Sequence, residues 1–178
     1  MRFFQLTLAR EKVVLLDIVK VFSAAILLCL SAFIRIPLFF SPVPVTMQTF
    51  VVFLIGGIMS PALACASIAL YISAGIFGAP FFANAGWGIP YVLGPTGGYL
   101  LGFFSAAAAM AALRSFVPRF FSMLVGIVII YLCGGLWLKA GYGMSWQQVF
   151  YLGMLPFFVP DIIKARVASW ICDKVSGR

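Results

Sequence analysis

The sequence predicts an all-α fold: a polytopic membrane protein with six transmembrane helices in one bundle and both termini in the cytoplasm. Of its 178 residues, 64% are hydrophobic and 9% are charged, and the mean hydropathy is +1.15. Apolar runs of about 20 residues recur, and each matches the hydrocarbon thickness of a bilayer. Short connections leave no room for a second unit, so residues 1–178 are expected to form a single integral-membrane domain.

The apolar runs define the predicted spans in chain order. They cover residues 18–36, 47–60, 62–78, 92–112, 120–139 and 149–172. Residues 1–17 form a charged cytoplasmic segment, expected to lie as an amphipathic stretch on the membrane. The first run continues to Ile36 and lacks a small-residue cleavage site, so it is a retained span and not a signal peptide. Ser60-Pro61 predicts a tight turn into the third span.

The basic residues predict the orientation of the bundle. With cytoplasmic termini, nine of the twelve Lys and Arg residues lie on the inner side, and only Arg35 and Lys139 lie on the outer side. This distribution agrees with the positive-inside rule, and the opposite orientation violates it. The formal net charge of +8 therefore reflects membrane topology, and no nucleic-acid partner is expected.

Residue types that are absent exclude several classes of enzyme. The chain has no histidine, which rules out a Ser-His hydrolase site, a two-histidine metalloprotease site and the usual haem ligation. Gly94–Tyr99 is rich in glycine but lacks the Gly-Lys-Ser/Thr ending of a phosphate-binding loop, so no nucleotide site and no ATP hydrolysis are expected. The four cysteines stand far apart in apolar runs, so they are interpreted as small buried hydrophobic residues and not as metal ligands.

Asp161 and Lys164 are the acid and the base that lie well inside a hydrophobic stretch. An ionisable group in the membrane costs several kcal/mol, so it marks a functional site by default. Three residues apart on a helix, the two side chains share a face. They either serve one ligand or neutralise each other as a structural ion pair, and the sequence leaves both interpretations open.

Two long outer loops have an unusual composition. Residues 37–46 contain three prolines and almost no charge, which predicts a stiff, extended segment that is either a lid over the bundle or an ordinary rigid loop. Residues 78–91 are rich in glycine and aromatic residues, and Asn84 is the one amide. These aromatic residues either form an interfacial belt or wall a small-molecule pocket; the uncharged setting favours the pocket.

Small residues open the fourth span. Gly97 and Gly98 permit close approach by a ligand or a neighbouring helix. Gly98, Gly102 and Ala106 then recur every four residues, a spacing typical of a face along which another helix packs closely.

Four segments, in this order, are similar to one known family. They read PVPVTMQ at 42–48, GIFGAPF at 75–81, GPTGGYLLGF at 94–103 and PFFVPDIIK at 156–164. Together they resemble the BioY family, the biotin-specific substrate-binding subunits of energy-coupling factor transporters. The chain departs from the family at Val159-Pro160, where members usually read Pro-Gly before the last aspartate.

The resemblance implies that the chain captures biotin from the outer side of a bacterial cell membrane. It also implies a membrane coupling protein and two cytosolic ATPases as partners, which fits a chain with no nucleotide site and no cofactor. Small residues on early helices of the family commonly face the coupling protein, and Ala62 and Ala66 are the best such pair here. The alternatives are a stand-alone channel or secondary transporter, for which the two halves show no convincing repeat, and a membrane enzyme.

The resemblance also implies a set of binding residues. Asp161, as a carboxylate, matches the N–H edge of the ureido ring, and Asn84 complements the same ring. Lys164 either receives the valerate carboxylate or keeps Asp161 charged; in the second case Arg35 or Lys139 becomes the partner of the valerate. The remaining expected contacts are apolar walls and residues of the family segments: Phe81, Trp87, Tyr99, Gln48, Thr96, Gly97 and Gly98.

Overall fold

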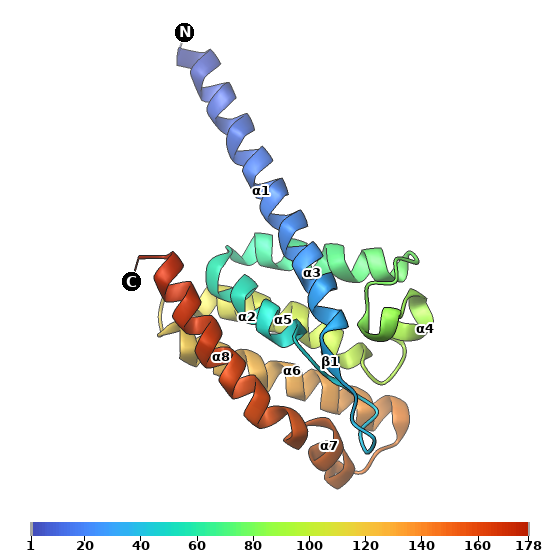
Figure 1. Cartoon of the computed structure of the whole chain (residues 1–178). Helices are drawn as coiled ribbons and strands as arrows, with labels where there is room; N and C mark the ends of the chain where they lie inside the picture. The colour runs from blue at the N-terminus through green and yellow to red at the C-terminus, as the bar shows by residue number, and fades with distance from the viewer. Residues whose placement is uncertain (1, 178) are drawn as a thin grey trace.

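A computed structural model describes residues 2–177, and these form a helical bundle with one small two-stranded ladder (Figure 1). The eight α-helices of this range are α1 (Arg2–Phe33), α2 (Gln48–Ile58), α3 (Pro61–Ile76), α4 (Gly88–Val92), α5 (Gly97–Leu113), α6 (Arg119–Tyr142), α7 (Trp146–Gly153) and α8 (Leu155–Val175). A single 3-10 turn, η1, covers Ala83–Ala85. Strands β1 (Arg35–Ile36) and β2 (Val45–Thr46) pair antiparallel, so the all-α prediction omitted this ladder.

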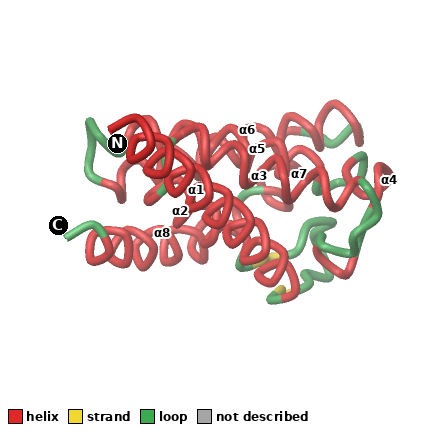
Figure 2. The backbone as a smooth tube through the Cα atoms, turned by 90° about the horizontal axis from the view of Figure 1, so that it is seen from above, coloured by secondary structure: helices red, strands yellow, loops and turns green. Residues whose placement is uncertain are grey.

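Helix α5 lies at the centre of the bundle, in contact with α2, α3 and α6. The small residues of α5 permit this: a Cβ added at Gly98 would clash with Trp137, and one at Gly102 would lie 2.9 Å from the Cα of Ile130. The spacing of small residues in the fourth run therefore correctly predicts close helix packing. Seen from above, both ends of the described chain lie at one end of the bundle, and α4 lies at the other (Figure 2).

Three predicted spans differ from the observed helices. α1 begins at Arg2, so the charged segment continues the first helix instead of forming a separate element, and α1 ends at Phe33, before Ile36. The fourth helix begins at Gly97, five residues later than predicted, because the short α4 and a turn precede it. The sixth run is two helices that meet at Met154, because Pro156 lies in the first turn of α8 and has no N–H to continue α7.

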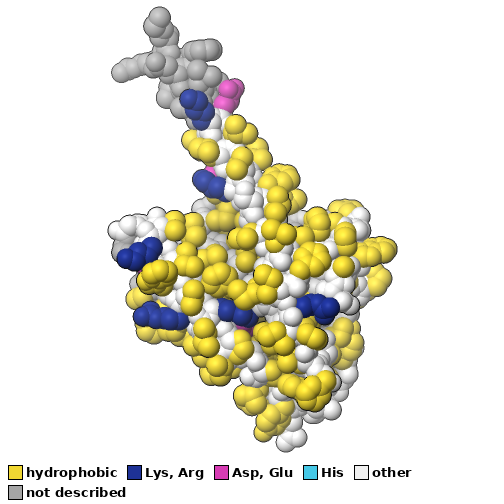
Figure 3. Space-filling view, in the orientation of Figure 1, with side chains coloured by type: hydrophobic (Ala, Val, Ile, Leu, Met, Phe, Trp, Pro, Cys, Tyr) yellow, Lys and Arg dark blue, Asp and Glu magenta, His cyan; other side chains and the backbone are white. Residues whose placement is uncertain are grey.

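The surface of the bundle suits a membrane. Two helical segments, Glu11–Phe33 and Arg119–Tyr142, are long and apolar enough to cross it, and α2, α3 and α5 are shorter apolar helices. Side chains such as Leu132 and Val128 on α6 are more than half exposed, and hydrophobic atoms cover much of the face in Figure 3. The count of six spans stays a prediction.

At one end of the bundle, arginine side chains join three helices. Arg119 donates to the carbonyl of Gly57 (3.2 Å) and pairs with Asp173 (2.5 Å), and Arg114 donates to the carbonyls of Gly57 and Ile58 (3.0 and 2.8 Å). These contacts satisfy carbonyl groups at the end of α2, where the helix dipole favours a cation. They attach α2 to α8 and to the beginning of α6.

Candidate functional site

The segment between α1 and α2 folds back over the bundle as a hairpin. Arg35 pairs with Thr46 and Ile36 with Val45, which closes residues 37–44 into a loop. The Ser41 hydroxyl donates to the carbonyl of Leu152 on α7 (2.7 Å), and Val43 is buried. The folded-back position agrees with a lid, although movement of the hairpin stays a prediction.

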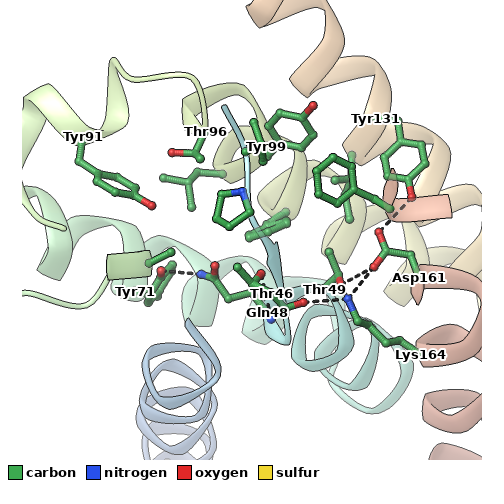
Figure 4. A pocket seen from close by; sticks show the side chains of 17 residues that line it. Thr46, Gln48, Thr49, Tyr71, Tyr91, Thr96, Tyr99, Tyr131, Asp161 and Lys164 are labelled. Carbon is green, nitrogen blue, oxygen red and sulfur yellow. Dashed lines mark hydrogen bonds and ion pairs between the residues drawn. The ribbon is translucent and has the colours of Figure 1, made fainter. Parts of the chain in front are cut away.

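Beneath this hairpin lies a cavity, named here the inner cavity, enclosed by α2, α3, α5, α6 and α8 (Figure 4). One wall is polar and most of the rest is aromatic or aliphatic. The lining residues are Val43, Pro44, Thr46, Gln48, Thr49, Tyr71, Ala83, Tyr91, Thr96, Tyr99, Leu100, Phe103, Ile130, Tyr131, Phe157, Asp161 and Lys164.

Asp161 is the centre of the polar wall. Its carboxylate is 3% exposed and accepts hydrogen bonds from Thr49 (2.8 Å), Tyr131 (3.0 Å) and Lys164 (2.9 Å). The Thr49 and Lys164 bonds both go to Oδ1, whereas Tyr131 donates to Oδ2. A carboxylate has about four acceptor positions, two on each oxygen, so Oδ2 keeps one for another donor.

Lys164 uses all three of its N–H donors within the protein. Besides Asp161, it donates to the backbone carbonyl of Thr46 (2.8 Å) and to the hydroxyl of Thr49 (3.0 Å). An ammonium group has three donors and no acceptor. Lys164 therefore joins α8 to α2 and to strand β2 of the hairpin, and the ion pair with Asp161 that the sequence left open is present.

Across the cavity from Asp161, a second polar pair joins α2 to α3. The Gln48 amide donates to the Tyr71 hydroxyl (2.6 Å), which in turn donates to the carbonyl of Phe81 (3.3 Å). Figure 4 shows Gln48 and Tyr71 on one side of the cavity, with Asp161 and Lys164 on the other. Polar groups therefore face each other across the space.

Aromatic side chains form the apolar walls. Tyr99 donates to the carbonyl of Gly153 (2.6 Å), which fixes its ring, and Phe157 lies 6.3 Å away between ring centroids. Tyr91 stacks on Phe82 at 4.8 Å. Burial raises the pKa of the Tyr91 phenol, so its hydroxyl keeps its proton at neutral pH.

A second cavity, named here the outer cavity, adjoins the first. Four residues line both: Pro44, Ala83, Tyr91 and Thr96. The remaining lining residues of the outer cavity are Arg35, Pro37, Leu38, Ser41, Pro42, Asn84, Pro90, Gly94 and Pro95. In it, the Arg35 guanidinium donates to the side-chain carbonyl of Asn84 (2.6 Å).

The structure brings half of the predicted site residues to the inner cavity and places the others elsewhere. Gln48, Thr96, Tyr99, Asp161 and Lys164 line the inner cavity. Asn84 lines the outer cavity. Gly97 and Gly98 lie where an added Cβ would clash with Val92 and Trp137, so their smallness serves helix packing.

Phe81 and Trp87 are not among the described residues that line the inner cavity, and their contact with a ligand stays a prediction. Phe81 lines an apolar groove between α1 and α3, and the Trp87 residue is 62% exposed. Left-handed backbone at Asn84 and Ala85 (φ 65° and 53°) turns the chain between them. Other aromatic residues take the expected place: Tyr91, Phe103, Tyr131 and Phe157.

Sequence reasoning missed several residues of the polar wall. Thr49 directly follows the family segment that ends at Gln48, so its position was a usable signal. Tyr131 carries a hydroxyl group in the middle of an apolar run, which is a weaker signal. Tyr71 gave none, because only the folded chain brings α3 to Gln48.

Sequence comparisons match the chain to one family over most of its length. The BioY family model matches residues 7–178. A "Probable biotin transporter BioY" from Pyrococcus horikoshii is 42% identical over 136 residues, which cover 76% of this chain and 82% of the relative. The "Biotin transporter BioY" of Thermotoga maritima is 36% identical over 149 residues, covering 82% and 86%.

A solved structure shows the same fold. The crystal structure at 2.1 Å of the S-component for biotin from an ECF-type ABC transporter matches with a TM-score of 0.83. The match covers 95% of this chain and 94% of that one, at 20% sequence identity. The likeness in fold therefore extends over nearly the whole chain.

Proposed function

The chain belongs to the BioY family, and from this premise we propose that it captures biotin and transports it across the membrane as the substrate-binding subunit of an energy-coupling factor system. The names of the relatives support biotin as the substrate. One observation of this molecule supports it most: a buried carboxylate at the wall of a largely apolar cavity that keeps an acceptor position on Oδ2.

Biotin has the chemistry that this wall can bind. Its ureido ring presents two N–H donors and one carbonyl, and its sulfur ring is apolar. An N–H group of the ureido ring fits the remaining position on Asp161 Oδ2, in a charge-assisted hydrogen bond. Gln48, across the cavity, offers an amide to the same ring system.

The apolar walls suit the fused rings. Tyr99, Phe103 and Phe157 surround the cavity from α5 and α8. Aromatic side chains supply large contact areas at a low cost in conformational entropy. Their positions are fixed in advance, since Tyr99 is held by Gly153 and Phe157 packs beside it.

The proposed assembly extends beyond this chain. We infer six spans in one domain, both termini in the cytoplasm of a bacterial cell, and a coupling membrane protein with two cytosolic ATPases that drive transport. The chain itself needs no cofactor and no nucleotide site in this scheme. Ala62 and Ala66 lie exposed on α3, where small side chains permit close contact with a partner helix.

Calorimetric titration of the purified chain with biotin tests the proposal. We expect saturable binding at one site without ATP, because capture needs only the preformed cavity. Proteoliposomes that contain the chain alone, under an imposed ion gradient, provide the second arm. No binding heat at any concentration, or gradient-driven accumulation of another solute, would favour a channel or a secondary transporter instead.

A further inference from the structure

A stripe of exposed side chains runs along α8. Its members follow each other at intervals of three or four residues, which places them on one face of the helix. In chain order they are Val159, Ile163, Arg166, Trp170 and Lys174, and all five are exposed. Near the C-terminal end of α8, Figure 3 shows dark blue side chains on either side of hydrophobic ones. This face, named here the α8 stripe, is therefore apolar at one end and cationic at the other.

Arg166 is the cation of the stripe that packs against the bundle. Its guanidinium lies 5.7 Å from the centroid of the Phe120 ring on α6. Among the described residues, it has no acidic partner. Three of the four acidic residues of the chain pair with other cations: Asp17 with Lys20, Asp161 with Lys164 and Asp173 with Arg119. The Arg166 charge is therefore left for a partner outside the chain.

The position of Arg166 corresponds to the edge of a membrane. Phe120 is the second residue of α6, so the guanidinium lies at the level where that helix begins. Lys174 lies in the last turn of α8, at the same end of the bundle (Figure 2). Trp170 lies about one turn from each cation, and tryptophan is enriched at membrane interfaces. Its indole N–H makes no hydrogen bond to the described residues, so a donor remains there.

We propose that the cationic end of the α8 stripe binds the phosphate group of an anionic phospholipid. Arg166 is the main contact, because a guanidinium can donate two parallel hydrogen bonds to one phosphate. Trp170 supplies a neutral donor and Lys174 a second charge, while the acyl chains lie along Val159 and Ile163. Within the part of the chain that the structure describes, none of these residues lines either cavity, so the site is independent of biotin capture.

A lipid matches this face better than a soluble anion does. The apolar end of the stripe continues directly from the cationic end, and one phospholipid molecule covers both. The helix dipole does not oppose an anion at Arg166, because its effect is confined to the last turn and Arg166 lies about two turns before Val175.

The site should prefer anionic headgroups over zwitterionic ones with the same acyl chains. Each cation near the membrane surface strengthens the attraction for an anionic lipid, so two of them predict a preference of about tenfold to thirtyfold for phosphatidylglycerol over phosphatidylcholine. The preference should decrease as the salt concentration rises.

The native Trp170 can report which lipid lies beside it. The full chain is reconstituted in phosphatidylcholine vesicles with increasing fractions of brominated phosphatidylglycerol, whose bromine atoms quench nearby indole fluorescence. The difference between the wild type and Trp170→Phe isolates the Trp170 signal from that of the other three tryptophans. We expect half-maximal quenching at about a tenfold lower fraction than with brominated phosphatidylcholine. Inorganic phosphate at constant ionic strength should not change the quenching; displacement by it would assign the site to free phosphate and overturn the proposal.

Arg166→Gln should remove the preference, so that both brominated lipids quench Trp170 equally, while biotin affinity stays at the wild-type level. Lys12→Gln is the matched control, since it removes the same charge from an exposed position of α1, and it should keep the preference. Thermal unfolding of each variant verifies that it is folded. If Arg166→Gln does not fold, Lys174→Gln in the last turn should reduce the preference severalfold.

Three results would overturn the lipid site. The first is equal quenching by the two lipids in the wild type, and the second is a preference that survives substitution of either cation. The third is quenching of Trp170 by neither lipid, which would mean that another protein chain covers the stripe. Biotin capture, measured separately by titration, would stand in each case.

Discussion

Two ionic clusters join α8 to α2, and they differ in what lies beside them. The cavity cluster consists of Thr49, Tyr131, Asp161 and Lys164; the end cluster consists of Arg114, Arg119, Asp173 and the carbonyl of Gly57. On α8 they are twelve residues apart, or about 18 Å at the helical rise. Only the cavity cluster lines either cavity.

The difference shows what makes an ion pair a site. Both clusters pair a basic side chain with a carboxylate through hydrogen bonds, so the pairing of charges alone does not separate them. In the end cluster, the arginine side chains donate to backbone carbonyls at the end of α2, so they act as a helix cap. In the cavity cluster, the carboxylate keeps an acceptor position beside empty space. An adjoining cavity therefore distinguishes an ion pair that can bind a ligand from one that only joins helices.

The largest effect is expected from Asp161→Asn. The substitution removes the charge and replaces one acceptor oxygen by an NH₂ donor, so it breaks the charge-assisted bond to the ureido ring. Biotin affinity should fall by about 2 kcal/mol or more, roughly thirtyfold. Asp173→Asn, the same change in the end cluster, should leave the affinity unchanged. Wild-type affinity in a folded Asp161→Asn chain, measured by calorimetry, would refute the site.

Arg119→Met tests the other side of the comparison. The Arg119 side chain is 7% exposed and donates to Gly57 and Asp173, so its loss removes one of the two arginines that cap the end of α2. Because Asp173 is itself 46% exposed, the ion pair contributes little, and we expect a loss of about 1–2 kcal/mol in unfolding free energy. Unfolding in mixed micelles measures this loss. A change in biotin affinity without a change in stability would contradict the division of roles.

Lys164→Met sharpens the role of the lysine within the cavity cluster. Since Lys164 contacts Asp161 and the framework around it, its removal should weaken biotin and biotin carboxamide together, by about tenfold. Parallel titrations with the two ligands provide the measurement. A loss confined to biotin would instead indicate that Lys164 binds the valerate carboxylate, and Arg35 would then not be needed as its partner.

Half of the cavity cluster could be predicted from the sequence, and there is a physical reason why the other half could not. A charge inside an apolar run is expensive, which is why Asp161 and Lys164 could be identified without a structure. A hydroxyl group in such a run costs much less, so Thr49 and Tyr131 gave a weak signal. Their roles depend on how α2 and α6 pack against α8, a relation between distant segments.

The fold shows the same limit. Hydropathy over a window of about 20 residues located α2, α3 and α6 within a few residues, because each is one uninterrupted apolar run. It merged α7 with α8, since the break at Met154 depends on local hydrogen bonding and not on polarity. It also missed the ladder at Arg35–Ile36, which exists only because the hairpin folds back on itself.

A smaller effect on binding is expected at the exposed face of α3. Ala62→Leu or Ala66→Leu adds bulk where the chain itself packs nothing closely, so biotin affinity should stay at the wild-type level. Transport by the complete system should fall, because a larger side chain prevents close approach of a partner helix. Uptake of labelled biotin by cells, beside titration in detergent, separates the two. Loss of binding in detergent would show that these positions serve internal packing.

The smallest expected change concerns the hairpin, which only the cavity cluster reaches, through the bond from Lys164 to the carbonyl of Thr46. If residues 37–46 open to admit biotin, a cysteine at the buried position Val43 becomes reactive only in the open state, and bound ligand should slow its labelling. In a background without the four native cysteines, labelling of Val43→Cys should slow severalfold at saturating biotin. Phe116→Cys, in the exposed turn before α6, is the matched control and should react at one rate throughout. Equal rates at Val43→Cys with and without biotin would show that the hairpin is a fixed wall, and that the two clusters differ by the cavity alone and not by a moving part.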